Sequence, residues 1–197
     1  MALIKSISGI RGTIGGKPGE SLSPIDIVKF ASAYGTWLRR RGRGPLRVVT
    51  GRDARVSGEM VAALVKSSLR SVGIDVIDTG LATTPTVEMA VTGLGAGGGI
   101  ILTASHNPAQ WNALKLLNEA GEFLSDADGR EVLALAATED FDYVTYDKLG
   151  GETQDKSWTE KHIMAVKRMP LVDAEAIKNA GFRIAVDAVC SVGGIAI

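Results

Sequence analysis

The feature that most constrains the fold is a short apolar run in the middle of the chain, Ile100-Ile101-Leu102. Gly97-Gly98-Gly99 precedes the run, and Asn107-Pro108 follows it within a few residues. A run that is mostly β-branched and lies between glycine and proline turn signals is typical of a buried strand. The run therefore predicts a buried strand whose carboxyl end opens into a turn.

Helical and strand patterns alternate on either side of this run. Helices are predicted from Ser23-Pro24 to Gly42, from a cap at Ser57 to Gly73, over 84–92 and from a cap at Ser125 to about 137, and strands over 46–50, 74–77 and 100–102. Strands that alternate with helices specify an α/β layer fold. We expect a three-layer α/β/α domain with a mixed, largely parallel sheet over residues 1–138.

The second part of the chain has a weaker pattern. Residues 139–156 are acidic, aromatic and glycine residues, which predicts a linker. Residues 157–197 predict a helix to about 169, a second over 174–180 and a strand over 183–187. Because a strand that is apolar on both faces needs neighbours and covering helices, we expect an incomplete second α/β domain and a chain truncated from a longer enzyme. An uncovered strand also predicts that residues 183–197 are either poorly ordered or pair with another molecule, which would give self-association through this part.

Composition excludes several classes of function. Lys plus Arg and Asp plus Glu number 22 each, so the formal net charge is zero and no nucleic-acid partner is indicated. The basic cluster 39–43 fits a helix end, where cations complement the helix dipole, although a polyanion patch is the alternative. Cys190 is the only cysteine, which favours a reducing compartment. No apolar run approaches the roughly 18 residues of a membrane span and no secretory pattern opens the chain, so we expect a cytoplasmic protein without membrane contact.

The turn after the predicted strand reads Thr103-Ala104-Ser105-His106-Asn107-Pro108. Ser105 is thereby placed at the carboxyl end of a strand, which is the edge where open α/β sheets bind ligands. The alternative is a structural turn in which Ser105 or Asn107 bonds the local backbone. The residues alone leave both interpretations open.

This hexapeptide resembles the phosphoserine loop of the α-D-phosphohexomutase superfamily. Three further segments resemble the family in the expected order, and they are Ser8-Gly9-Ile10-Arg11-Gly12, Gly51-Arg52-Asp53-Ala54-Arg55 and Asn112-Ala113-Leu114-Lys115. Ala113 stands where a glycine is usual, and Ser6-Ile7-Ser8 stands where many members have Thr-Asp before the glycine. The resemblance covers nearly the whole chain and corresponds to the first domain of the family and the opening of the second.

The resemblance implies a mutase that moves phosphate between the 1 and 6 positions of a hexose, with glucose, mannose and glucosamine phosphates all open as substrates. Ser105 would carry the phosphate through a bisphosphorylated sugar. Mg²⁺ would be held by the serine phosphate and an Asp-x-Asp-x-Asp run of the second domain, which this chain does not contain. Asp126-Ala127-Asp128 is better explained as an acidic first helical turn. The isolated chain is therefore expected to be inactive.

Other site residues follow from the charge of a phosphoserine, which needs basic neighbours. Arg11, set between glycines, suits close approach to an anion, although it could instead pair with a carboxylate. Lys115 is the candidate proton-transfer group, with a solvated lysine as the alternative. His106 is expected to orient the phosphoserine or the sugar.

The residues of the segment 51–55, which follows the predicted strand 46–50, are expected to have different roles. Arg52 is expected to neighbour the phosphate, and Asn107 of the serine loop to contact phosphate or substrate. The Asp53 and Arg55 pair is expected to be mainly structural.

The sequence is also compatible with functions other than that of a mutase. A non-catalytic phosphosugar-binding or interaction module on the same scaffold is the alternative. A serine hydrolase is disfavoured because the Gly-x-Ser-x-Gly elbow is absent. The run 93–98 fits the dinucleotide pattern G-x-G-x-x-G, but it precedes a strand instead of linking a strand to a helix, so we expect a flexible connector there.

Overall fold

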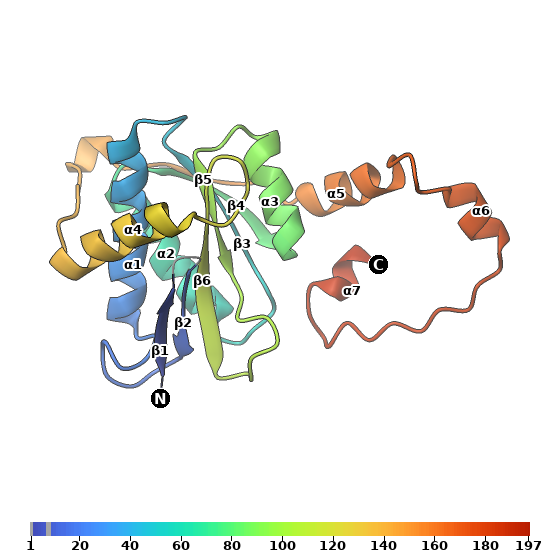
Figure 1. Ribbon diagram of the computed structural model, residues 1–197, viewed down its shortest axis with the longest axis horizontal. Coiled ribbons are helices and arrows are strands. Elements are labelled where there is room, and N and C mark those ends of the chain that lie inside the picture. The colour runs from blue at the N-terminus through green and yellow to red at the C-terminus, as the bar shows by residue number, and fades with distance from the viewer. Residues whose placement is uncertain (1, 7–8) are drawn as a thin grey trace.

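The computed structural model describes residues 2–6 and 9–197, so Ser8 of the first matching segment lies outside the described residues. The described residues form a seven-stranded sheet in the order β1-β2-β6-β5-β3-β4-β7 (Figure 1). The strands are β1 Leu3–Ser6, β2 Gly9–Thr13, β3 Arg47–Arg52, β4 Asp75–Leu81, β5 Gly98–Leu102, β6 Trp111–Leu117 and β7 Glu152–Gln154.

The sheet is mixed, as expected, but it divides into two halves. The pairs β3–β4, β3–β5 and β4–β7 are parallel, whereas β1–β2, β2–β6 and β5–β6 are antiparallel. The parallel half contains the three strands predicted from the sequence. The antiparallel half consists of the β1–β2 hairpin and β6, and β6 pairs with β5.

Helices cover both faces of the sheet, which confirms the three-layer α/β/α fold. Three helices, α1 Pro24–Arg41, α2 Gly58–Ser71 and α4 Asp126–Thr138, enclose the larger core with β-strand residues such as Ile100 and Leu102. On the other face α3 Thr84–Gly93 packs on β3 and β5 around Val49 and Ile101. Because α3 lies over the parallel half, the same face of β2 and β6 carries exposed side chains such as Arg11.

The first helix begins and ends where the sequence predicts. Ser23 Oγ accepts a hydrogen bond from the Asp26 N–H at 3.3 Å, and the Asp26 carboxylate accepts one from the Ser23 N–H at 3.2 Å. This reciprocal pair is a capping box. Gly42 ends the helix with φ of 60°, in the left-handed region that glycine adopts without steric strain.

The predicted cap at Ser57 is wrong in its chemistry. The Ser57 side chain makes no capping hydrogen bond to α2. Instead its Oγ accepts a hydrogen bond from Asn112 Nδ2 at 2.9 Å. Asn112 is buried on β6, so the hydroxyl connects the start of α2 to a strand on the other side of the serine loop.

The segment expected as a linker, 139–156, is bonded to the domain along its length. Its strand β7 pairs in parallel with β4 and widens the sheet by one strand. Lys66 Nζ contacts Asp78 at 2.8 Å and Glu152 at 2.7 Å, which fixes β7 to α2 and β4. Earlier in the segment, Arg40 pairs with two acidic residues, Asp140 and Asp142.

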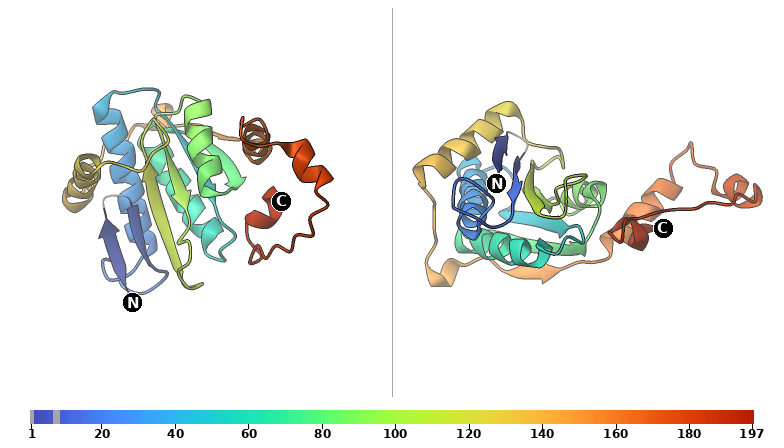
Figure 2. Two further views of the ribbon diagram at one scale, coloured as in Figure 1. Left: turned by 45° about the vertical axis from the view of Figure 1, so that its right-hand side comes forward. Right: turned by 90° about the horizontal axis from the view of Figure 1, so that it is seen from below.

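The last part of the chain begins with a docked helix and continues as an open loop (Figures 1 and 2). The two predicted helices are present as α5 Trp158–Lys167 and α6 Ala174–Asn179, and a short α7 spans Gly193–Ala196. The predicted strand over 183–187 is wrong. Within the described residues this segment pairs with no strand, and Ile184 and Val186 remain 75% and 55% exposed. Without a partner strand, the backbone N–H and C=O groups of this segment have only water as a hydrogen-bond partner.

The run 93–98, expected as a flexible connector, starts at the last residue of α3 and ends at Gly98, the first residue of β5, where it is closely packed. A Cβ on Gly98 would lie 2.2 Å from the Tyr34 hydroxyl oxygen and 2.7 Å from the Leu117 carbonyl oxygen. The fully buried Tyr34 donates to that carbonyl at 2.6 Å, and burial raises the pKa of its phenol. Gly98 therefore allows α1 to approach the start of β5.

We predict that Gly98→Ala destabilises the chain by about 1–3 kcal/mol, since the added methyl must displace Tyr34 or the strand. Thermal unfolding followed by circular dichroism should show a lower Tm. Gly194→Ala, on exposed α7, is the matched control, because its Cβ would meet only ordinary contact at 3.6 Å. Equal melting temperatures for the two variants would contradict this account of Gly98.

Candidate functional site

The candidate site lies at the carboxyl ends of β3 and β5, where the connections from the two strands run toward opposite edges of the sheet. β3 leads through α2 to β4 on one side, whereas β5 leads directly to β6 on the other side. Loops that leave neighbouring parallel strands in opposite directions open a crevice at the carboxyl ends of the strands. The loop after β3 carries Asp53 and Arg55, and the loop after β5 carries Ser105. An Asp53 N–H bond to the Leu102 carbonyl at 3.1 Å joins the two loops.

Ser105 is exposed at the outer end of this crevice. Its φ is 54°, in the left-handed region, which costs a non-glycine residue about 1–3 kcal/mol. The Ser105 N–H donates to Thr103 Oγ1 at 3.1 Å. The side chain is thus presented to solvent by a strained backbone that a local hydrogen bond supports.

The Asp53 and Arg55 pair lies within hydrogen-bond distance of the serine loop. Asp53 Oδ2 accepts from Thr103 Oγ1 at 2.6 Å and from Arg55 Nε at 3.1 Å. The two terminal nitrogens of Arg55 donate to four loop carbonyls, which belong to Ser105 at 2.7 Å, Asn107 at 2.7 Å, Pro108 at 2.8 Å and Trp111 at 3.0 Å. The sequence interpretation missed the contribution of Thr103, because its partner Asp53 is 50 residues away and no local pattern signals the contact.

His106 and Asn107 line the same pocket as Ser105, which has a volume of about 450 Å³. The exposed His106 adjoins Ser105 in the chain. Asn107 Nδ2 donates to the Ala104 carbonyl at 2.8 Å, so its amide serves the turn in the way that the structural alternative describes. Val189, Cys190 and Ser191 of the C-terminal loop form another wall of this pocket.

Arg11 and Lys115 lie together in a second pocket of about 440 Å³, with Phe123 on its rim. Arg11 pairs with Ala113 and Gly9 with Lys115 in the β2–β6 register, so the two cationic side chains share one face of the sheet. Lys115 Nζ lies 5.8 Å from the centre of the Phe123 ring. These cations occupy the face that α3 leaves uncovered.

The two pockets are neighbours in the sheet, although they are separate hollows. Lys115 is paired with Ile101 of β5, four residues before Ser105. At ~3.3 Å per residue, the strand path between Ile101 and Ser105 is at most about 13 Å. The structure therefore brings Arg11 and Lys115 together and puts Ser105 in the next pocket along the edge of the sheet.

Arg52 is not brought to the serine. Its guanidinium donates to Glu59 Oε1 at 3.1 Å and to the Asp53 carbonyl at 3.2 Å. Its side chain lines a different pocket, beyond β4, together with Lys156 and Gly80.

The donor set of the described residues does not fit a magnesium ion. Nowhere in residues 2–6 and 9–197 do three His, Cys, Asp or Glu side chains form a group that could hold a metal. Asp128 accepts from the Ser125 hydroxyl at 2.7 Å, and Asp126 pairs with Arg130. Both carboxylates thus belong to the first turn of α4, as the sequence predicts.

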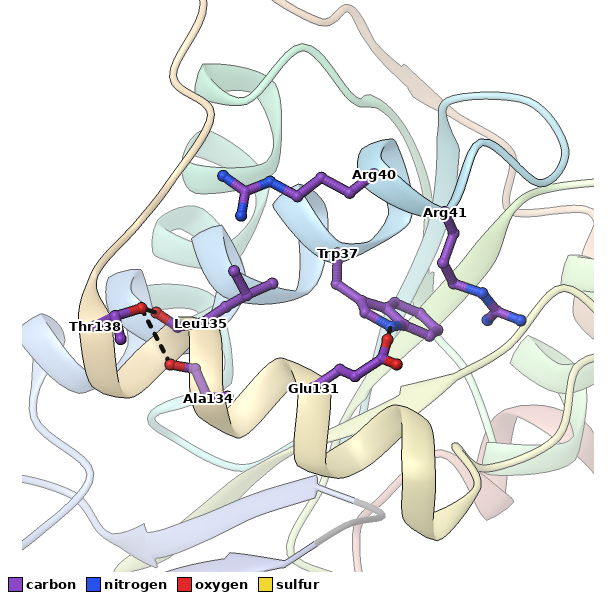
Figure 3. A pocket seen from close by; sticks show the side chains of 7 residues that line it. All are labelled: Trp37, Arg40, Arg41, Glu131, Ala134, Leu135 and Thr138. Atoms are coloured by element: carbon purple, nitrogen blue, oxygen red, sulfur yellow. Dashed lines mark hydrogen bonds between the residues drawn. The ribbon is translucent and has the colours of Figure 1, made fainter.

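A third hollow, of about 400 Å³, lies between α1 and α4 (Figure 3). Trp37 Nε1 donates to Glu131 at 2.9 Å across it, and the Arg41 guanidinium stacks on the Trp37 ring at 4.5 Å. Figure 3 shows these groups engaged with one another between the two helices. The polar side chains of this hollow contribute to helix packing, and its lining contains no serine or cysteine nucleophile.

Residues 3–143 match the family model of phosphoglucomutase/phosphomannomutase, alpha/beta/alpha domain I. The chain belongs to this family. A phosphoglucomutase/phosphomannomutase of Thermococcus kodakarensis is 40% identical over 178 residues, which are 89% of this chain and 38% of that protein. A phosphoglucosamine/phosphogalactosamine mutase of Sulfurisphaera tokodaii is 30% identical, and the match covers 99% of this chain and 41% of that protein.

A solved structure supports the fold of this phosphoglucomutase/phosphomannomutase family chain. The crystal structure of a family protein from Burkholderia thailandensis superposes with a TM-score of 0.67 at 23% identity, over 83% of this chain and 36% of that chain. This likeness concerns the α/β/α architecture alone. The chain spans 38% and 41% of the length of the two mutases above. No helix among the described residues is both long enough and apolar enough to cross a bilayer.

We predict that Ser105→Gly is more stable than Ser105→Ala by about 1 kcal/mol, because glycine adopts positive φ without strain whereas alanine retains it. Chemical denaturation of the two variants, each compared with the wild type, measures the difference. Both variants remove the hydroxyl, so each controls for its loss. An alanine variant as stable as the glycine variant would show that the backbone of this residue is relaxed.

Proposed function

We propose that the whole protein to which this chain belongs is a hexose phosphomutase in which Ser105 carries the phosphoryl group. One observation carries the proposal: in a chain of this family, an exposed serine with strained backbone lies at the crevice between β3 and β5. Strained backbone at the surface persists only where the surrounding structure holds it, and it is concentrated at functional sites. The sugar is a glucose, mannose or glucosamine phosphate.

The proposed reaction transfers the phosphoryl group twice. A free hydroxyl oxygen of the hexose monophosphate attacks the phosphorus of phosphoserine, and the bond between phosphorus and Ser105 Oγ breaks. The sugar hydroxyl loses its proton, the serine oxygen gains one, and a hexose 1,6-bisphosphate forms. After the sugar reorients, Ser105 Oγ attacks the phosphorus of the other phosphate, and the bond between that phosphorus and the sugar oxygen breaks. The serine hydroxyl loses its proton and the sugar oxygen gains one, which regenerates phosphoserine and leaves the isomeric monophosphate. Neither water nor any other co-reactant is consumed.

Residues of this chain have distinct proposed tasks in that cycle. Arg11 attracts the phosphate groups of the substrate, because a guanidinium matches phosphate geometry with two parallel N–H donors. Lys115, on the same sheet face and in the same pocket, is the proposed group that exchanges a proton with the sugar hydroxyl. His106 orients the substrate beside Ser105. Arg52 has no part in the transfer in this proposal, since its guanidinium is bonded to Glu59. Asn107 supports the turn through its bond to the Ala104 carbonyl and stays a candidate contact of the substrate in the pocket of Ser105.

Mg²⁺ is the proposed cofactor of the whole protein, where it would compensate the charge of phosphoserine. The chain itself contributes only Ser105, through its phosphate, because its carboxylates form no suitable group among the described residues. The remaining ligands would have to come from outside the present sequence. We expect the protein to be cytoplasmic, on the basis of its single cysteine, and to act on small phosphosugars without a nucleic-acid or membrane partner.

We expect Ser105→Ala in the whole protein to abolish phosphate incorporation and to reduce turnover by several orders of magnitude, because no other hydroxyl replaces the carrier. Intact mass spectrometry after incubation with a hexose 1,6-bisphosphate measures incorporation, and a coupled assay measures turnover. Ser191→Ala, in the wall of the same pocket, is the matched control and should retain the phosphate. Turnover that survives in Ser105→Ala would refute the carrier role. A wild type that binds phosphosugars but takes up no phosphate would support the non-catalytic module.

We also predict that the 197-residue chain alone has no detectable mutase activity, since it lacks a magnesium-binding carboxylate group in its described residues. The assay is the conversion of glucose or mannose 1-phosphate by purified chain in the presence of Mg²⁺. Measurable conversion would show that the chain contains a complete site.

A further inference from the structure

We infer that Arg55 is a positioning residue that holds the serine loop in its reactive shape, acting with Asp53 and Thr103 on the backbone of Ser105. The inference rests on the proposed function for its kinetic consequence. Its structural part concerns this chain alone.

The donors of Arg55 are fully used. A guanidinium has five N–H donors. Arg55 makes one hydrogen bond to Asp53, three to carbonyls of the serine loop and one to the carbonyl of Trp111, the first residue of β6. The side chain is only 11% exposed, and its partner Asp53 is 13% exposed. A largely buried guanidinium with five acceptors is a fixed part of the structure and has no donor left for a substrate.

The acceptors show what Arg55 does. The four carbonyls belong to residues between 105 and 111, so one side chain spans the whole turn from Ser105 to the start of β6. All four oxygens must point inward to reach one guanidinium. That requirement fixes the path of the turn, including the peptide that follows Ser105.

A second set of hydrogen bonds fixes the peptide before Ser105. Thr103 Oγ1 donates to Asp53 at 2.6 Å and accepts the Ser105 N–H at 3.1 Å. Asp53 therefore connects the two sets of hydrogen bonds, since it also accepts from Arg55 Nε at 3.1 Å. With its N–H and its carbonyl both held, Ser105 is restrained to φ of 54° against the intrinsic preference of its backbone.

Lysine cannot replace Arg55 in this role. Its ammonium has three donors around a single point, and it cannot reach carbonyls arranged along a turn as a planar fork does. Arg55→Lys keeps the charge and the pairing with Asp53 but leaves loop carbonyls unbonded. The variant therefore separates loop geometry from electrostatics.

The first experiment uses the 197-residue chain and does not depend on mutase activity. Amide hydrogen exchange and ¹³Cα and ¹³Cβ chemical shifts of residues 104–111 are measured by NMR in the wild type, Arg55→Lys and Thr103→Val. We expect the Asn107 amide, bonded to the Ala104 carbonyl in the wild type, to exchange about tenfold faster in Arg55→Lys, and the Ser105 shifts to move toward those of extended backbone in both variants. Amides of β5 should be unchanged. Arg130→Lys, which alters an exposed ion pair, is the matched control.

The second experiment measures kcat and KM of the same variants in the whole protein. A misplacement of about 1 Å at a reacting atom can reduce a rate by about 10²-fold, so we expect kcat of Arg55→Lys to fall by about that factor. KM for the hexose 1-phosphate should stay within about twofold, because all five donors of Arg55 are bonded within the chain. A residue that only stabilised the fold would lower Tm and leave kcat of the folded molecules unchanged.

The outcomes separate this inference from the proposed function. Wild-type loop dynamics and shifts in Arg55→Lys overturn the positioning role, whatever the enzyme does. A rise in KM with unchanged kcat also overturns it, since that result indicates direct substrate binding. If the whole wild-type protein shows no mutase activity, the proposed function fails, and the NMR result still decides whether Arg55 holds the loop.

Discussion

The parallel pairing of β3 with β5 is the constraint on which the candidate site depends. It brings together two loops that are about fifty residues apart in the chain, one with Asp53 and Arg55 and one with Ser105. Once the strands are in register from Val48–Gly98 to Arg52–Leu102, the carboxylate and guanidinium of the first loop lie within hydrogen-bond distance of the second. The core packing of α1 supports this register at the other end of β5, where Tyr34 of α1 lies against Gly98.

Local sequence patterns were sufficient to predict β3, β4 and β5 of the parallel half of the sheet. The helices over 23–138 and the strands around 46–50, 74–77 and 100–102 are present, because apolar periodicity and capping residues act over a few residues. The antiparallel half and the parallel edge strand β7 were harder to predict. β2 contains two glycines and β7 is three polar residues, so neither has a strand pattern, and both form because a neighbouring strand offers free backbone groups.

The candidate site, like the sheet, could be predicted from the sequence only in part. The sequence predicted the exposure of Ser105 and the placing of Arg11 near Lys115, the former from strand and turn signals and both from the family resemblance. The direction of the Arg52 side chain was not predictable, since Glu59 and the loop after β3 compete for it in three dimensions. The bonds from Arg55 to the serine loop and the link from Asn112 to Ser57 join residues that are fifty or more positions apart, so no local sequence pattern signals them.

The left-handed backbone at Ser105 has a consequence for which alcohol can occupy the site. Serine and threonine carry hydroxyl groups of similar chemistry, but a β-branched residue at positive φ brings its methyl group against its own peptide planes. The turn thereby admits a primary alcohol and disfavours a secondary one. The geometry of the main chain, more than the reactivity of the oxygen, accounts for the amino acid found at this position.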